Sequence, residues 1–577
     1  METMKAEVET LLLDVRALHS DVRQQARDIG ACWQRANTFF GAEALLESVD
    51  SGAIAPISGR WLVAHARAGG VMKRRQELPS EAFVAPSKVH RLVAALGEDF
   101  GLAFVALSYR WLAAGAADPD RFHLQKVARV AKMYLEAPAS DRSHTHVSPL
   151  AAAFEKHGID EPADFCLFWD FGSLFQPPRT AAQTTLFRRG LERSNVWYGH
   201  HSTVAWLCTE LPPSSAADQQ TYGQSGWCYV EAAMSAAIKV GNRRLDLALV
   251  TPETTLYGGE CWIDAVRLDA VCAARRLPPP LPETVAHLLA TEKRFTHQGD
   301  VHVVGRLYAD YFAEVCATAT SLEFSRLDWT VDELRALLYA LPRFRVLRRL
   351  DLSHNFRLGA SPGCAESLAD AACALPQLET LHLDHGYGLP LRALTGEAPI
   401  TALDMQGCRL GAASAKVIAR LLGRNSTLTN LDCRMNAIHG DGDRALSEAI
   451  LASAHLEVFG SLPLRTLREG GARGMGGATE SFGLDLSNRH LMAAEIQVLT
   501  PLLAQNAGLT SLNLSFNGVQ EAEARALAAA LETAPALTLL DVDANPFLSE
   551  RGEQADEAKR ALRAAAARRP GFVLKGL

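Results

Sequence analysis

Polar side chains end an apolar run in the first third of the chain. The run starts at Phe104, and its apolar and β-branched residues predict a strand that is buried on both faces. The run ends in Ser108, Tyr109, Arg110 and Trp111. A second apolar run, residues 165–170, ends in Asp170. Ligands of open α/β sheets bind at the carboxyl ends of the strands, so we expect the chemistry of this region at that edge.

Several expected elements position these residues. Strands are expected over 104–111, 165–170 and 203–208, and helices over 122–135, 185–194 and 225–239. This alternation of strands and helices predicts an open parallel sheet of the α/β class.

Three sequence boxes in this region resemble known families. The residues Phe104 to Arg110, and later Ser225-Gly-Trp-Cys-Tyr-Val-Glu231, resemble the first and last boxes of TIR domains. Together with 167–176 and Tyr222, they are similar as well to the heterokaryon-incompatibility (HET) domain, which is related to TIR in fold. The boxes occur in the family order over about 100–240. The sequence departs from the pattern in a long insert, 138–160, and in a proline-bearing loop, 171–180, that matches TIR only in position.

The resemblance implies an activity. In TIR relatives that cleave NAD, the glutamate of the last box is catalytic, and this position is Glu231 here. Its carboxylate would stabilise the ribosyl cation that forms when nicotinamide leaves. NAD would then be a substrate, and no cofactor is expected. The implied substrate-binding residues are Ser108, Tyr109, Arg110, Trp111, Asp170 and Trp227. A structural explanation competes with this one: Glu231 would favour the dipole at a helix start, Trp227 would belong to the core, and the domain would only self-associate.

The last 260 or so residues repeat themselves. The frame L-x-x-L-x-L-x-x-N-x-L starts at Ala319, Leu347, Leu378, Ile400, Leu428, Leu456, Ser481, Leu509 and Leu537. The spacing is near 28 residues, with short intervals of 22 after Leu378 and 25 after Leu456. The frame resembles leucine-rich repeats of the ribonuclease-inhibitor-like kind, which implies a solenoid of about nine strand–helix units with a parallel sheet on its concave side. We expect residues 470–477 to form a mobile loop and 553–569 to form a capping helix.

The fifth frame position is expected to face outward from the concave sheet. It carries the candidate protein-binding residues Asp351, His382, Asp404, Asp432, Asp485, Asn513 and Asp541. Six of the nine fifth positions are acidic when Glu323 is included, which would give a negative stripe that steers a basic partner. Alternatively, Asp is simply frequent at this position in such repeats.

The composition and the absence of certain motifs argue against several kinds of partner and site. The 577 residues carry a net charge of −7, which argues against nucleic acid as a main partner. Eleven cysteines occur without a C-x-x-C pair, and the histidine pairs 144/146 and 200/201 lack nearby acidic or Cys ligands, so no metal site is expected. There is no phosphate-binding G-x-x-x-x-G-K-[S/T] motif, no stretch apolar enough to span a membrane and no signal-peptide core. We therefore expect a cytoplasmic protein.

Four regions are predicted: N-terminal helices over 1–95, including an amphipathic helix over 5–36; a TIR/HET-like domain over 96–245; a helical, proline-containing connector over 246–318; and the repeats over 319–577. We expect an intracellular sensing or signalling protein. The repeats would bind a protein, and the α/β domain would signal by self-association. Two alternatives remain: an NAD glycohydrolase regulated by the repeats, and a scaffold whose α/β domain is catalytically dead.

Overall fold

The computed structural model describes residues 38–577, except 114, 137–147, 214–220, 255–261, 264, 361–362 and 471–480. The expected helix over 5–36, the histidines 144 and 146 and nearly all of the expected loop over 470–477 lie outside the described residues. The chain divides into two compact units, residues 1–323 with 343–346, and residues 324–342 with 347–577.

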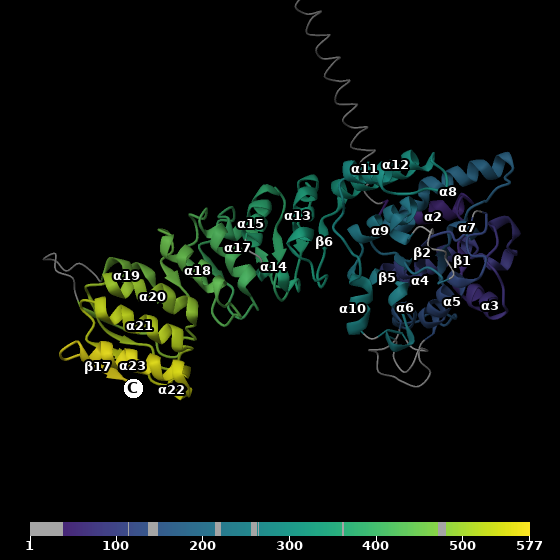
Figure 1. Ribbon diagram of the computed structural model, residues 1–577. Coiled ribbons are helices and arrows are strands. Elements are labelled where there is room, and N and C mark those ends of the chain that lie inside the picture. The colour runs from purple at the N-terminus through teal and green to yellow at the C-terminus, as the bar shows by residue number, and fades with distance from the viewer. Residues whose placement is uncertain are drawn as a thin grey trace, which may run out of the picture. The chain divides into compact units, whose positions relative to one another are not determined.

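The first unit is built on a five-stranded sheet with the order β1-β3-β2-β4-β5 (Figure 1). Its strands are β1 (Ile57–Ser58), β2 (Phe104–Tyr109), β3 (Cys166–Phe168), β4 (Val204–Cys208) and β5 (Arg244–Asp246). The central strand β2 is parallel to both neighbours, and all six of its residues are buried, as expected for a strand covered on both faces. The prediction of a wholly parallel sheet was wrong at one edge, because β1 pairs antiparallel with β3.

Helices surround this sheet. They are α2 (Glu43–Asp50), α3 (Gly59–Arg67), α4 (Pro86–Leu96), α5 (Phe122–Leu135), α6 (Pro149–Lys156), α7 (Asp170–Ser173), α8 (Ala181–Gly199), α9 (Gly226–Ala237), α10 (Ala265–Ala273), α11 (Pro282–Thr291) and α12 (Asp300–Thr318). The last three fall in the expected connector, yet they lie within the first unit. Tyr311 on α12 shows why: its fully buried hydroxyl donates to the carbonyl of Met234 on α9, so the segment completes the core of the sheet domain.

The second unit repeats strand and helix. Its strands are β7 (Arg349–Asp351), β8 (Thr380–His382), β9 (Gly388–Pro390), β10 (Ala402–Asp404), β11 (Asn430–Asp432), β12 (Val458–Phe459), β13 (Leu462–Pro463), β14 (Phe482–Asp485), β15 (Leu509–Asn513), β16 (Leu539–Asp541) and β17 (Val573–Lys575). Its helices are α13 (Val331–Ala340), α14 (Phe356–Ala360), α15 (Cys364–Ala374), α16 (Leu391–Leu394), α17 (Ala412–Leu422), α18 (Asp441–Ala452), α19 (Leu464–Glu469), α20 (Ala493–Gln505), α21 (Glu521–Thr533), α22 (Pro546–Ser549) and α23 (Glu553–Ala567).

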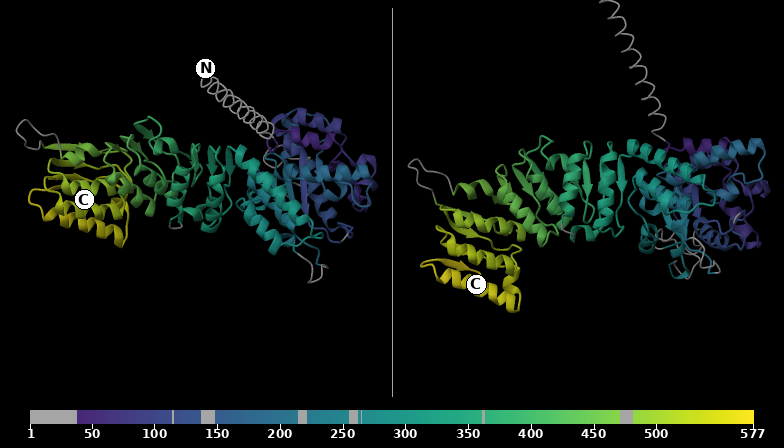
Figure 2. Two further views of the ribbon diagram at one scale, coloured as in Figure 1. Left: turned by 90° about the horizontal axis from the view of Figure 1, so that it is seen from above. Right: turned by 45° about the horizontal axis from the view of Figure 1, so that its top comes forward.

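The repeat frame sets the strands. A strand begins at each of the nine frame starts or within two residues after it, with β6 (Ser321–Glu323) following the first of them. Most central frame leucines are buried, for example Leu431 and Leu512 at 1% and 0% exposure, whereas Leu403 and Leu484, on the strands that follow the two hairpins, are half-buried. The neighbouring helices α20, α21 and α23 stack side by side in sequence order (Figure 2). Each repeat unit therefore buries its apolar frame side chains against the next unit.

Asparagines join successive repeats. The Asn517 amide donates to the carbonyls of Leu486 and Leu514, while its oxygen accepts the backbone N–H groups of Arg489 and Leu491. The same arrangement recurs at Asn355, Asn436 and Asn545. These side chains satisfy backbone groups where each strand turns away, which explains the asparagine in the frame.

The two short intervals interrupt the strand stack. After Leu378 the chain forms the antiparallel hairpin β8–β9, and after Leu456 it forms the hairpin β12–β13. Among the described residues, β10 pairs with β11 and β14 pairs with β15, and no ladder crosses either hairpin. An interval of 22 or 25 residues leaves no room for a full repeat helix, so only the short α16 and α19 follow the hairpins.

Candidate functional site

The carboxyl ends of β2, β3 and β4 meet at one edge of the first sheet because these strands are parallel. Ser108 and Tyr109 close β2, and Asp170 follows β3 as the first residue of α7. The helix α9 brings Glu231 to the same edge. The structure thus gathers most of the residues that the sequence singles out, as the topology of an open α/β sheet requires.

Glu231, Ser108 and Tyr222 form a hydrogen-bonded chain. The Ser108 hydroxyl, fully buried, donates to the Glu231 carboxylate at 2.6 Å and lies 2.7 Å from the Tyr222 hydroxyl. Since Ser108 gives its proton to Glu231, Tyr222 is the donor of the second bond. The pKa of Glu231 is raised to about 8, mainly by burial and also by the nearby Asp170 carboxylate, while hydrogen bonding with Ser108 opposes the rise. The carboxyl is therefore largely protonated at neutral pH.

Asp170 organises the neighbouring aromatic residues. Its carboxylate accepts hydrogen bonds from the Tyr109 hydroxyl at 2.8 Å, the Trp111 indole at 2.9 Å and the backbone N–H of Phe171. The Trp111 ring also meets Phe171 edge to face. These side chains therefore fix one another at the strand ends, and a direct role in substrate binding stays a prediction for them.

Arg110 lies near α9, and Trp227 belongs to the first turn of that helix. The half-buried Arg110 lies near Cys228, where its positive charge opposes the burial that raises the pKa of that thiol. The Trp227 indole donates to Asp300 on α12 at 3.0 Å, so its polar atom is directed to that helix and not to Ser108. Tyr198 was not anticipated; its hydroxyl donates to the Leu107 carbonyl, and no local sequence pattern marks it.

His200, shortly before β4, is held by backbone groups. His200 is fully buried, its ring nitrogen lies 3.0 Å from the Gly41 carbonyl, and burial lowers its pKa to about 3. Its own carbonyl accepts a hydrogen bond from Lys239. In the part of the chain that the structure describes, no group of three or more His, Cys, Asp or Glu side chains could hold a metal.

The fifth frame position of the repeats has a backbone role. At six of the sites, the side-chain oxygen accepts the backbone N–H two residues ahead, at 2.9–3.1 Å. These residues are Asp351, Asp404, Asp432, Asp485, Asn513 and Asp541. At the seventh, the His382 ring lies 2.8 Å from the Gly386 carbonyl. Such turns favour Asp and Asn for local reasons, so the acidic column follows from the turn geometry and need not signal a partner.

The acidic side chains at the fifth frame position differ in whether a neighbouring arginine already pairs with them. Asp351 is paired with Arg349, and Asp432 with Arg434, at 2.8 and 2.6 Å. Asp404 and Asp485 are exposed, and neither carboxylate forms an ion pair with a described residue. The column therefore presents isolated negative charges rather than a continuous stripe.

Large apolar side chains lie exposed beside the same turns. Met435 and Phe516 occupy the eighth frame position, where both have positive φ angles of 57°, and they are 53% and 61% exposed. This backbone conformation costs a non-glycine residue energy, yet it turns these side chains outward. Their equivalent positions place two exposed apolar side chains on the same side of the repeats.

The chain was compared with known families, proteins and structures. No family model matches the chain. The sequence is 30% identical over 255 residues to the Tonsoku-like protein of Danio rerio; the match covers 41% of this chain but only 16% of that protein. A crystal structure of the leucine-rich repeat-containing protein LegL7 from Legionella pneumophila is 17% identical, with 46% of this chain and 86% of that chain covered. Its TM-score of 0.14 supports no conclusion about the fold. No helix among the described residues is long and apolar enough to cross a membrane.

Proposed function

We propose that the chain is a protein-interaction scaffold whose second unit is a leucine-rich repeat solenoid that recognises a protein through the strand side of its repeats. The first unit, a TIR/HET-like domain, passes this event on by self-association. The observation that carries the proposal is the recurring turn after each strand. It satisfies its own backbone with Asn and Asp side chains and leaves side chains such as Met435 and Phe516 exposed.

The hydrogen bonding of the strand-end turns supports this function. Each unit places its strand-end turn at an equivalent position, so the turns of neighbouring units together form an extended surface. The backbone of the turns is satisfied internally, by Asn517 and its equivalents. Exposed side chains there can therefore vary without loss of the fold, which suits a surface that recognises a protein.

The charges of the strand ends can be tested without disturbing the turns. Asn513 makes the same turn as the aspartates, so Asp404→Asn, Asp485→Asn and Asp541→Asn together should keep the fold and remove three negative charges. We expect partners recovered with the full chain by affinity purification to bind less tightly to this variant and with weaker salt dependence.

A matched control removes three exposed acids from the repeat helices: Glu366→Gln, Glu448→Gln and Glu557→Gln. If this control weakens association as much as the strand-end variant does, or if neither has any effect, recognition lies outside the strand side.

A second candidate function rests on the first unit. In an NAD-cleaving relative the catalytic glutamate would lie at the carboxyl edge of the sheet. Glu231 lies at this edge, with its carboxyl group 2.6 Å from the Ser108 hydroxyl. In this proposal Glu231 stabilises the ribosyl cation, and only its ionised form can do so. Because the pKa of Glu231 is about 8, nicotinamide release should increase as pH rises through 8.

The measurement is nicotinamide release from NAD by wild type and by Glu231→Gln at matched thermal stability. Loss of the charge should lower the rate about a hundredfold or more. Equal rates, or none from wild type even at concentrations that promote self-association, would leave the first unit a binding module.

A further inference from the structure

The short repeat that starts at Leu456 interrupts the strands of the second unit but not its helices. Among the described residues, no ladder joins a first group of strands, β10 to β13, to a second group, β14 to β17. On the helix side α18 packs against α20, and the short α19 has only six residues. The two groups of strands are therefore joined by helix packing and by side chains, without a backbone ladder.

Arg434 links the two groups at the carboxyl ends of their strands. It follows β11, and its guanidinium pairs with the Asp432 carboxylate of the same turn at 2.6 Å. Its Nη1 donates to the Ser461 hydroxyl in the hairpin β12–β13 at 2.6 Å and to the Arg489 carbonyl, after β14, at 2.7 Å. One side chain thus connects the turn after β11 to the hairpin and to the turn after β14.

Two further side-chain hydrogen bonds cross the interruption among the described residues, and both lie on helices. The Ser447 hydroxyl of α18 lies 3.1 Å from the Gln497 side-chain oxygen of α20. The Asn506 amide, at the end of α20, donates to the Leu467 carbonyl of α19 at 2.8 Å. Since these contacts are on the helix side, a movement that breaks the contact between Arg434 and Arg489 would pivot about the packed helices.

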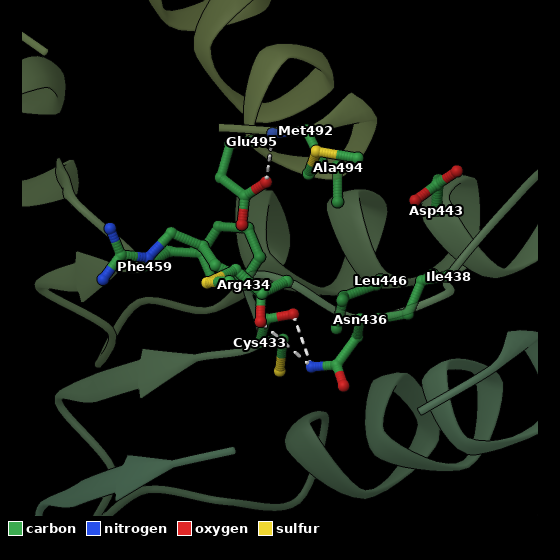
Figure 3. A pocket seen from close by; sticks show the side chains of 11 residues that line it. Cys433, Arg434, Asn436, Ile438, Asp443, Leu446, Phe459, Met492, Ala494 and Glu495 are labelled. Carbon is green, nitrogen blue, oxygen red and sulfur yellow. Dashed lines mark hydrogen bonds between the residues drawn. The ribbon is translucent and has the colours of Figure 1, made fainter. Parts of the chain in front are cut away.

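A buried carboxyl group lies beside this link. Glu495, in the first turn of α20, is 2% exposed and accepts a hydrogen bond from the backbone N–H of Met492 at 3.0 Å. It points toward the side of a small hollow that Arg434 and Phe459 form (Figure 3). The hollow has room for about one water molecule, so this carboxyl group has almost no contact with solvent.

The groups around Glu495 favour its uncharged form. Its pKa is raised to about 7, mainly by burial and also by the Asp432 carboxylate, while hydrogen bonding with backbone N–H groups and the Arg434 guanidinium oppose the rise. The buried thiol of Cys433 lies on the same side, and its pKa is raised by burial and by Glu495. From α18, Asp443 lines the same hollow, and burial raises its pKa to about 6.

We infer that this short repeat is a pH-sensitive joint, which Arg434 holds closed and which opens by a pivot about α18 and α20 when Glu495 ionises. The physical reason is solvation. In the closed form the charge would be buried, and Arg434 does not offset it because Asp432 already pairs with that guanidinium. In the open form water reaches the carboxylate. The inference stands apart from the proposed function, and opening would change the angle between two parts of the strand side.

The pH range follows from the pKa of Glu495 in the two forms. With access to water the pKa takes its ordinary value near 4.5, against about 7 in the closed form. The preference for the closed form is therefore complete below about pH 4.5 and is lost as the pH rises through 7. Linkage then predicts that the open fraction increases about twentyfold from pH 5.5 to pH 7.5.

Hydrogen exchange with mass spectrometry on the full chain tests this inference, because it detects a rarely populated open form. The reporter is the Met492 amide, which bonds to Glu495, and the internal control is the Gln520 amide, which bonds in the same way to Glu523 at the start of α21. After correction for intrinsic exchange, protection of the Met492 amide should fall about twentyfold from pH 5.5 to pH 7.5, and that of Gln520 should not follow it. Glu495→Gln keeps an acceptor for Met492 and should abolish most of the fall.

Arg434→Gln should lower the protection of the Met492 amide about tenfold or more at both pH values, because it removes the contact with the Arg489 carbonyl. Ser461→Ala removes one contact of Arg434 and should lower the protection by a smaller factor, so it decides the matter where Arg434→Gln does not fold. Protection of Met492 that does not depend on pH, an equal change at Gln520, or no effect of either substitution would each overturn the inference.

Discussion

Removal of the Asn517 side chain should destabilise the repeats far more than its size suggests. The residue is 8% exposed, and the two shortest hydrogen bonds of its amide go to the carbonyls of Leu486 and Leu514, at 2.8 and 3.0 Å. Its oxygen accepts two more, from the N–H groups of Arg489 and Leu491 at 3.0 and 3.1 Å. Asn517→Ala loses all four and leaves backbone groups of two repeats without partners.

The magnitude follows from these four bonds. A typical buried hydrogen bond contributes about 1 kcal/mol net, and a buried donor left unsatisfied costs more. Water can reach part of the opened site, which limits the loss. We therefore expect Asn517→Ala to lower the free energy of unfolding of the second unit by about 3–5 kcal/mol. Asn513→Asp keeps the acceptor for the Ser515 N–H and should change stability by no more than about 0.5 kcal/mol.

Hydrogen exchange with mass spectrometry measures this effect locally. In Asn517→Ala, peptides containing the amides of Arg489 and Leu491 should lose protection, together with a lower denaturation midpoint followed by circular dichroism. In Asn513→Asp neither quantity should change. Unchanged protection of the 489–491 segment in Asn517→Ala would refute the claim that this side chain holds the two repeats together.

Further predictions concern the core of the repeats and the pH dependence of the first unit. Leu512→Ala should cost about 2–5 kcal/mol through a buried cavity, measured by denaturant unfolding, because Leu512 is fully buried; a loss below about 1 kcal/mol would contradict its place in the core. Glu231 has a folded pKa of about 8, raised from about 4.5, so its protonated form favours the folded state. Its contribution to stability is therefore present below pH 4.5 and lost as pH rises toward 8. The melting temperature of the wild type should therefore fall as pH rises over this range, and it should fall less in Glu231→Gln. An equal fall in both proteins would show that Glu231 is not responsible.

The strands of the repeats could be predicted because their signal is local. Leucines at the first, fourth and sixth frame positions, followed by an asparagine three residues after the last, mark one buried edge and one turn, and both appear in the structure at Leu512 and Asn517. The consequence of the short intervals could not be predicted in the same way. It depends on how α18 meets α20 across a missing helix, which is a packing relation between distant parts of the chain.

The candidate site of the first unit was predictable only in part. The position of Ser108 at a strand end and the motif around Glu231 place both at the carboxyl edge, and they meet there. The mutual contacts of Asp170 with Tyr109 and Trp111 depend on side-chain orientation, which spacing does not encode. The antiparallel pairing of Ile57 with Leu167 joins residues 110 positions apart and leaves no local pattern.

The central claim, that the strand side of the repeats binds a protein, is tested most directly by site-specific photocrosslinking. A benzoylphenylalanine at Phe516, which is 61% exposed beside a strand-end turn, should crosslink one defined partner in cells. The same group at the exposed Glu448 on α18 should not crosslink it. Crosslinking from Glu448 and not from Phe516, or no partner from either, would contradict the account.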